Sequence, residues 1–99
     1  MVNVYLKTFT TDKGTMVACC DEDLIGKTFR EGRLRLSLEP GFYGDTVWAV
    51  GEALVLLDKA DNLNLVGKTI IEAAIERGVV HREAVIVISG IPHVQVMRM

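Results

Sequence analysis

The segment VNVYLKTFTTDKGTMVACC, residues 2–20, decides the fold that the sequence predicts. Apolar and polar residues alternate over positions 2–7, which is the period-two pattern of a half-buried strand. Thr11-Asp12-Lys13-Gly14 is typical of a tight turn, and residues 15–20 beyond it are apolar and β-prone. We therefore expect a β-hairpin closed by a glycine-containing loop.

The two cysteines, Cys19 and Cys20, are adjacent at the end of this hairpin. Successive side chains of a strand point to opposite faces of the sheet, so the two thiols cannot easily bind one metal ion together. A disulfide between sequence neighbours would be strained. We expect reduced thiols and, because the segment MVNVYLKTF shows no secretory-signal pattern, a cytoplasmic protein.

The most regular alternation in the chain is RLRLSLE, residues 33–39. It predicts a strand that follows a turn at Glu31-Gly32 and ends at Pro40-Gly41, with a loop over residues 42–44. The side chains expected to face inward are Leu34, Leu36 and Leu38.

Two helices are predicted in the middle of the chain. Asp45 or Thr46 is expected to cap the first, which would run to about Ala60 with an apolar face of Val47, Val50, Leu54 and Leu57. Gly51 inside it indicates either a very close neighbour or a later helix start. Residues 61–64 are the capping signal of the second helix, which would end near Gly78 and pack through Ile70, Ile71, Ala74 and Ile75.

The C-terminal part predicts two further strands. AVIVI, residues 84–88, is short, β-branched and typical of a central strand. Ser89-Gly90-Ile91-Pro92 interrupts it, and a last strand follows through Val94 and Val96, with Pro92 excluded from its hydrogen-bonded interior. The sequence thus predicts an α+β fold over residues 1–99 as a single domain, with one sheet of about five strands and two helices on one face.

Composition limits the classes of function. The chain has 99 residues, 49% of them hydrophobic, so a disordered protein is excluded, and no apolar run is long enough to cross a membrane. Because so small a domain cannot bury all of its apolar surface, this composition favours a protein partner or self-association. The net charge of −2 gives no global field for nucleic acid. A local basic patch stays open as an alternative to a mixed solvated face, formed by Lys27, Arg30, Arg33 and Arg35.

Two segments, LIGKTF at residues 24–29 and LVGKTI at residues 65–70, contain the Gly-Lys-Thr that ends a phosphate-binding loop. That loop also needs a glycine five positions before the Gly-Lys pair, and the two segments have Asp21 and Asn62 there. We interpret both as turn signals and expect no nucleotide cofactor. A helix that begins near Gly67 would still offer free N–H groups to an anion.

The segment Ser89–Gln95, SGIPHVQ, is the strongest candidate for a functional site. It places a glycine, a proline, an imidazole and an amide between two apolar strands, where regular pairing would serve packing better. One interpretation is a bulge or sharp turn at a sheet edge, and the other is a polar site for a ligand or partner. The candidate residues are Gly90, Pro92, His93 and Gln95, with Asn64 and Gly67 as outer members.

Catalytic and metal-binding patterns are weak. His81 and His93 lack zinc-type spacing with the cysteines, so we expect no metal site. A small enzyme or ligand-binding protein remains the alternative, with His93 as acid–base group and Cys20 or a carboxylate nearby.

Three ordered motifs carry a resemblance to a known family: VACCDEDLIGKTFREG at residues 17–32, NLVG at residues 64–67 and GIPHVQ at residues 90–95. Together they resemble the archaeal domain-of-unknown-function family 424 over nearly the whole chain. The resemblance implies a small cytosolic archaeal protein without an established activity. Relatives usually have alanine where this chain has Val94, and the larger valine would narrow a pocket there. Relatives also usually lack the Lys-Thr that follows Gly67 here.

The function that follows is an uncharacterised non-catalytic binding or interaction module. Its contact surface would include His93 and Gln95. A link to translation or RNA processing would follow only from the archaeal, cytosolic character that the resemblance implies. A weak RNA interaction through the basic residues is the third hypothesis.

Overall fold

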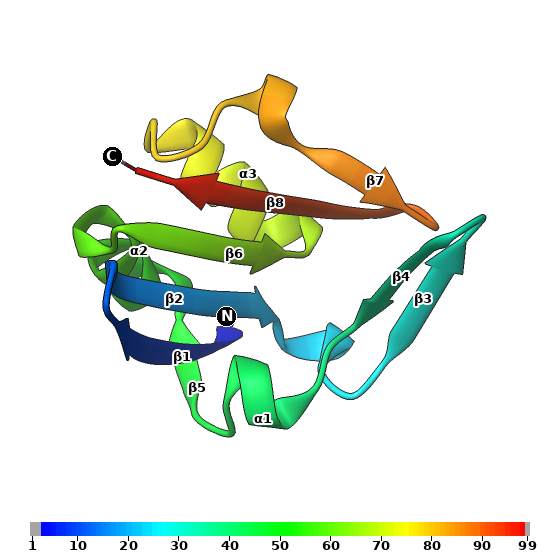
Figure 1. The fold of residues 1–99 in the computed structure, drawn as a ribbon, viewed down its shortest axis with the longest axis horizontal. Helices are drawn as coiled ribbons and strands as arrows, with labels where there is room; N and C mark the ends of the chain where they lie inside the picture. Colours follow the sequence, from blue (N-terminus) through cyan, green and yellow to red (C-terminus); the bar gives the residue numbers. More distant parts are fainter. Residues whose placement is uncertain (1–2, 99) are drawn as a thin grey trace.

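The fold is built on one six-stranded sheet, seen face-on in Figure 1. The protein is described by a computed structural model that covers residues 3–98. Neighbouring strands are antiparallel except β2 and β6, which are parallel. In spatial order the strands are β5 (Val47–Ala49), β1 (Asn3–Thr11), β2 (Gly14–Asp21), β6 (Asn62–Val66), β8 (Ile91–Met97) and β7 (Ile86–Ile88).

The N-terminal hairpin is confirmed by the pairing of β1 with β2. Their register runs from Val4 opposite Asp21 to Thr11 opposite Gly14, and the Thr11 hydroxyl accepts a hydrogen bond from the Lys13 N–H within the turn. Val2 lies outside the described residues. The hairpin places β2 in the sheet interior, where both of its faces are covered.

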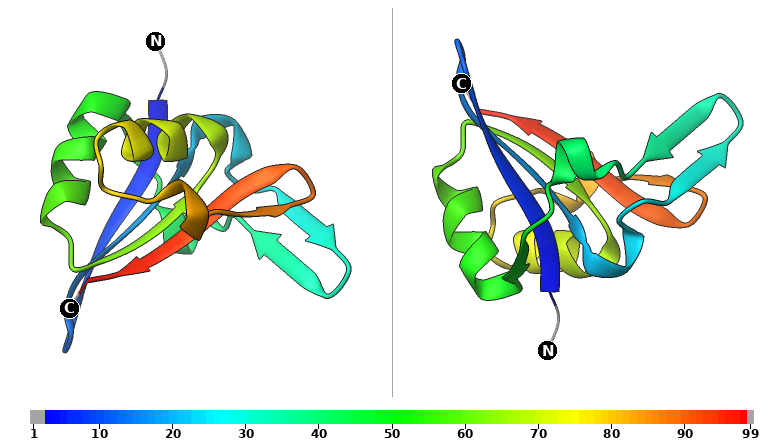
Figure 2. Two further views of the ribbon diagram at one scale, coloured as in Figure 1. Left: turned by 90° about the horizontal axis from the view of Figure 1, so that it is seen from above. Right: turned by 90° about the horizontal axis from the view of Figure 1, so that it is seen from below.

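The two faces of the sheet carry different layers. Helices α2 (Val50–Lys59) and α3 (Lys68–Glu76) cover one face, here called the helical face. The other face, called the front face, is partly covered by the short helix α1 (Pro40–Tyr43), the single turn η1 (Glu22–Leu24) and the hairpin of β3 (Thr28–Glu31) with β4 (Leu34–Ser37) (Figures 1 and 2). The prediction of two helices on one face holds for α2 and α3.

Each face has its own buried cluster, and β2 contributes to both. Cys19 belongs to the cluster beneath α2 and α3, whereas Cys20 belongs to the front cluster with Leu38 and Tyr43. The expectation that the two thiols point to opposite faces is therefore confirmed.

The prediction that residues 61–64 cap a helix was wrong, because Asn62–Val66 is the central strand β6. Leu63 and Leu65 point into the helical-face cluster, which leaves Asn62 and Asn64 on the front face. The alternation of amide and leucine therefore belongs to a strand. Helix α3 begins only after Gly67 and gives way to Gly78, close to the predicted end.

The first predicted helix starts later than expected. Val47–Ala49 forms the edge strand β5, and α2 begins at Val50, where the Glu52 carboxylate accepts a hydrogen bond from the Ala49 N–H. Of the two explanations for Gly51, a close neighbour or a later helix start, the structure shows the later start. Gly51 lies in the first turn of α2 and is exposed. The predicted loop over residues 42–44 was partly wrong as well, since one helical turn spans Pro40–Tyr43.

The predicted central strand at residues 84–88 is instead an edge. A turn, η2 (Arg82–Ala84), precedes β7, which is three residues long and leaves Ile86 and Val87 about half exposed. The interior position belongs to β8, which contains Pro92. The Pro92 carbonyl accepts a hydrogen bond from the Gly67 N–H just past the end of β6. The Gly67 carbonyl, which would face an N–H at position 92, accepts from the Ile71 N–H of α3 instead, so the missing N–H of Pro92 leaves no acceptor unpaired.

The strand predicted at residues 33–39 pairs with residues 28–31 in a separate two-stranded sheet. Leu36 and Leu38 are buried as expected, but Leu34 is 49% exposed near the tip. The fold is α+β, but the main sheet has six strands where about five were predicted. The short helix α1 is additional to the two predicted helices. Within residues 3–98 no helix is long and apolar enough to cross a membrane.

Candidate functional site

The Gly-Lys-Thr at residues 67–69 lies between a buried strand and a helix, the place where a phosphate loop would sit. The chain fills this place with its own carboxylate: Asp21 accepts hydrogen bonds from the N–H groups of Thr69 and Ile70, both at 2.9 Å. Asp21 is 7% exposed, and burial raises its pKa against the opposing effect of these two bonds. The anion expected at this helix start is therefore part of the protein.

Gly67 is required by that arrangement. Its φ is +116°, and a Cβ on it would lie 2.4 Å from the Asp21 Cγ. The glycine of this motif thus makes room for a carboxylate and not for a phosphate. The other Gly-Lys-Thr, at residues 26–28, enters strand β3 and provides no helix N-terminus.

The segment Ser89–Gln95 does not break the sheet as expected. Ser89 and Gly90 form a two-residue hairpin turn with φ of +52° and +82°, which matches a type I′ turn. From Ile91 the strand pairs regularly with β7 and β6, including Val66 opposite His93. Gly90 therefore serves the turn and Pro92 the strand end. The interpretation of the segment as a sharp turn at a sheet edge is confirmed at Ser89-Gly90 beside the edge strand β7, whereas the expected departure from regular pairing over residues 90–95 was wrong.

His93 is buried on the front face, with 9% of its surface exposed. Its Nδ1 lies 3.0 Å from the Leu65 carbonyl oxygen, and because a carbonyl only accepts, Nδ1 carries the proton. Burial lowers the pKa of this imidazole, which keeps it neutral at pH 7 and leaves Nε2 as an acceptor. The ring lines a hollow of about 260 Å³ together with Ile86 and Gln95.

Two other candidates lie beside His93. Asn64 is directly opposite Gln95 in the register of β6 with β8, so both amides stand on the front face. The Tyr43 hydroxyl donates a 2.9 Å hydrogen bond to the Asn64 Oδ1, which fixes that amide and leaves its N–H groups to other acceptors. The structure thus brings His93, Gln95 and Asn64 together, and it places Gly67, Gly90 and Pro92 in backbone roles.

Sequence reasoning missed Asn62, which extends the same surface. Asn62 is opposite Met97 and lines a second hollow, of about 620 Å³, together with Asn64 and Gln95. Its Oδ1 is buried without a hydrogen-bond partner in the part of the chain that the structure describes. The alternation Asn62-Leu63-Asn64-Leu65 was the available signal, hidden because it was interpreted as a helix cap. The term β6–β8 face is used below for Asn62, Asn64, His93, Gln95 and Met97.

The cysteines do not complete a catalytic pair with His93. Burial raises the pKa of Cys20 to about 12 and that of Cys19 further, so both are protonated thiols at neutral pH. Val66 separates Cys20 from His93 in the sheet, which puts two strand spacings, roughly 10 Å, between them. No cluster of three metal-binding side chains occurs among residues 3–98.

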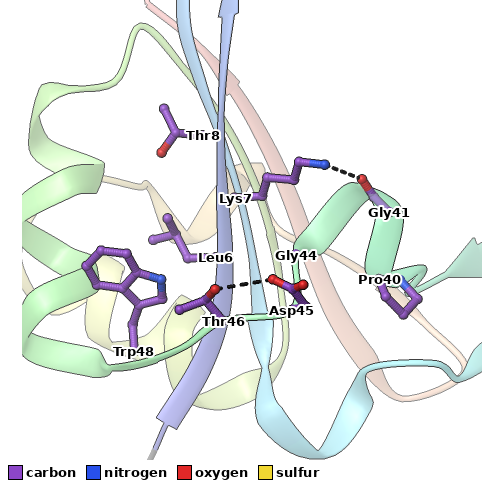
Figure 3. Close-up of a pocket in the computed structure, with 9 residues that line it drawn as sticks. All are labelled: Leu6, Lys7, Thr8, Pro40, Gly41, Gly44, Asp45, Thr46 and Trp48. Carbon is purple, nitrogen blue, oxygen red and sulfur yellow. Dashed lines mark hydrogen bonds between the residues drawn. The ribbon is translucent and has the colours of Figure 1, made fainter.

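A cleft of about 520 Å³ at the outer edge of β1 is shown in Figure 3. Two pairs of its polar groups are hydrogen-bonded within it: the Lys7 ammonium donates to the Gly41 carbonyl at 2.9 Å, and the Thr46 hydroxyl donates to Asp45. The Trp48 Nε1 is buried without a partner among the described residues. The cleft contains no nucleophile and base in contact.

The four predicted basic residues are brought to one element. Arg30 and Arg35 lie on the β3–β4 hairpin, Arg33 in its turn, and Lys27 immediately before β3. All four side chains are exposed. In the sequence these four residues are interspersed with acidic residues, whereas in the structure they lie on or next to one hairpin.

Comparison with known proteins gives one structural relative of clear fold similarity and a family. The fold resembles the crystal structure of an uncharacterized conserved protein from Methanopyrus kandleri, with a TM-score of 0.78 and 19% identity over 98% of this chain and 94% of that one. At this identity the likeness concerns the fold alone. No curated protein matches the chain. A family model described as "Protein of unknown function (DUF424)" matches residues 8–99, and the chain therefore belongs to the DUF424 family.

Proposed function

We propose that the protein is a non-catalytic cytosolic module that binds a protein partner through the β6–β8 face. The observation that carries this proposal is a sheet face that α2 and α3 leave uncovered, on which the exposed Gln95 amide lies beside the His93 imidazole and the Asn64 amide. The cytosolic location rests on two free, buried and unreactive thiols.

The chemistry of the face favours a protein over a polyanion. The centre of a protein–protein interface is depleted of charged residues and enriched in methionine and aromatic side chains. The β6–β8 face has three amides and a neutral imidazole in its centre, with Met97 72% exposed at one end and Ile86 49% exposed at the other. A flexible methionine adapts to the shape of an apolar partner side chain.

The polar groups define what the partner must supply. His93 Nε2 is an acceptor, whereas the Asn64 amide has free N–H groups because its oxygen is held by Tyr43. The exposed Gln95 amide can both donate and accept. A peptide segment offers both N–H donors and carbonyl acceptors along its backbone. We expect the partner segment to be uncharged, with apolar side chains that reach Met97 and Ile86.

A photo-crosslinking amino acid at Gln95 tests this proposal in native cells. The matched control carries the same residue at Val55, which is 45% exposed on α2 at the helical face. We expect a discrete protein adduct from position 95 that is absent from position 55, and mass spectrometry should map it to an uncharged, apolar segment. Adducts with nucleic acid or with a second copy of this chain would reject a protein partner of this kind.

Affinity then checks the contact with purified components. Gln95→Arg puts a charge into the centre of the face and should weaken binding of the mapped segment on the order of tenfold or more, because a buried unpaired charge is costly. Val55→Arg adds the same charge elsewhere and should leave affinity unchanged. Equal affinities of the two variants would contradict the proposal.

A further inference from the structure

The β3–β4 hairpin has one face toward the protein and one toward solvent. Gly32, with φ of +59°, and Arg33 make its two-residue turn, and the register puts Arg30 directly opposite Arg35. Phe29 and Leu36 face the front cluster, so the two arginines lie on the solvent side. Figure 1 shows the hairpin projecting beyond the main sheet.

Two like charges directly opposite each other in an antiparallel pair destabilise it, and their Cβ atoms are about 5 Å apart. Arg30 and Arg35 occupy such a pair on a four-residue ladder. Flanking them on the same face, the Thr28 and Ser37 hydroxyls are hydrogen-bonded to each other at 3.2 Å. This face therefore combines two cations with hydroxyl donors at a cost to hairpin stability.

The other arginines of the chain show a contrasting pattern. Arg77 pairs with Asp58 and Arg82 with Glu72, while Arg98 donates to three backbone carbonyls. The hairpin arginines have no such partner among residues 3–98. The fold thus engages its arginines everywhere except on this element.

The acidic residues near the hairpin are turned to other uses. Glu31, between Arg30 and the turn, points to the opposite face and accepts a 2.7 Å hydrogen bond from the Ser89 N–H. Glu39 lines a hollow at the hairpin base together with Lys27, where it offsets part of that charge. Glu22 and Asp23 belong to the preceding turn η1. The face of Arg30 and Arg35 is therefore left positive, although the whole chain carries −2.

We propose that this hairpin face binds the phosphate backbone of single-stranded RNA, as a second surface independent of the β6–β8 face. Paired guanidinium groups hold phosphate oxygens in bidentate geometry, with Arg33 in the turn extending the contact along the strand. Ser and Thr hydroxyls donate hydrogen bonds to phosphate and sugar oxygens. A ribose 2′-hydroxyl, which DNA lacks, can both donate to and accept from the hydroxyls of Thr28 and Ser37. Because the contacts proposed on this face are to phosphate and sugar and none is to a base, we expect little preference for RNA sequence.

Fluorescence anisotropy with a mixed-sequence single-stranded RNA tests the inference. Three contacts predict that log affinity falls against log salt with a slope of roughly −2, because each neutralised phosphate contributes about −0.7 on a single strand. Arg30→Gln with Arg35→Gln should reduce that slope by about 1.4 and weaken binding at low salt by on the order of tenfold or more. The control, Lys59→Gln with Lys68→Gln, removes the same charge from α2 and α3 and should change neither.

The hairpin variant should also be at least as heat-stable as the wild type, since it removes a repulsive pair. Loss of RNA binding in a variant of undiminished stability would support the site. The inference is overturned by an absence of RNA binding at low salt, by equal effects of the two double variants, or by equal affinity for DNA of the same sequence or for poly-glutamate. None of these results bears on crosslinks from Gln95, so the two proposals fail separately.

Discussion

At the scale of single residues, two glycines make room for carboxylates that tie distant segments together. Gly67 leaves space for Asp21, which caps α3, and Gly14 leaves space for Asp61, whose Oδ2 accepts a 2.8 Å hydrogen bond from the Thr15 N–H. Both glycines have φ above +100°. In each case the strand β2 is fixed to the segment that enters or leaves β6.

Gly67→Ala should destabilise the protein more than a substitution of glycine in open space. With φ of +116° and ψ of +147°, Gly67 lies in a backbone region that only glycine adopts readily, which costs roughly 1–3 kcal/mol for an L-residue. Displacement of the Asp21 cap adds about 1 kcal/mol. Gly78→Ala is the control, because Gly78 has φ of +82° and nothing near its Cβ position. Urea denaturation should give the larger loss for Gly67→Ala, and Asp21→Ala should be less than additive with it. Equal losses at residues 67 and 78 would mean that the Asp21 contact does not matter.

His93 predicts a loss of stability toward acid. Its folded-state pKa is lowered by burial, so the neutral imidazole contributes stability that is fully present above the unfolded value of about 6.5 and declines as pH falls. Asp21, with a raised pKa, acts in the opposite direction. Thermal midpoints at pH 7.5 and 5.5 should differ less in His93→Gln than in the wild type. An unchanged difference in His93→Gln would exclude this role.

At the scale of elements, the sequence predicted those helices and strands that depend on interactions between residues close together in the chain. The β1–β2 hairpin and α3 follow from a turn signal between alternating segments and from an apolar stripe that ends at a glycine. Strand β6 could not be recognised, because Asn62 is equally typical of a helix cap and the pairing that makes it a strand comes from β2 and β8. The position of β7 at the edge likewise depends on which strands pair, which composition does not encode.

The candidate site shows the same division. His93 and Gln95 were predicted from their residue types, with Asn64 as an outer candidate, and the three do lie on one face. The reason given for His93 and Gln95, a broken strand, was wrong. Regular pairing itself aligns them, since residues opposite each other in a ladder share a face. Asn62 was missed for the same reason as β6.

Amide hydrogen exchange should distinguish the interior strands from the edge. The amides of β6 lie between two neighbours and beneath α3, whereas β7 has one neighbour and exposed side chains at Ile86 and Val87. We expect β6 amides to exchange near the rate of global unfolding and β7 amides much faster, by local opening. Comparable protection of β6 and β7 in an NMR exchange series would place β7 inside the sheet, as its sequence suggested.

At the scale of the whole molecule, one sheet separates two buried clusters and belongs to both. Leu65 lies in the helical-face cluster and Leu38 in the front cluster, each fully buried. Strands β2 and β6 contribute alternate residues to the two sides, for example Leu65 to one and Val66 to the other. Loss of packing on either side therefore weakens the same strands, and we expect the molecule to unfold as one unit.

Leu38→Ala and Leu65→Ala test this expectation, since each should cost about 2–5 kcal/mol through a cavity. Trp48 packs against the helical-face cluster and is the one tryptophan of the sequence, so its fluorescence reports on the side opposite Leu38. If the clusters unfold together, Leu38→Ala lowers the urea midpoint of Trp48 fluorescence and that of helical circular dichroism by the same amount, at unchanged slope. A wild-type fluorescence midpoint in Leu38→Ala would show that α1 and the β3–β4 hairpin detach from a sheet that the helices hold alone.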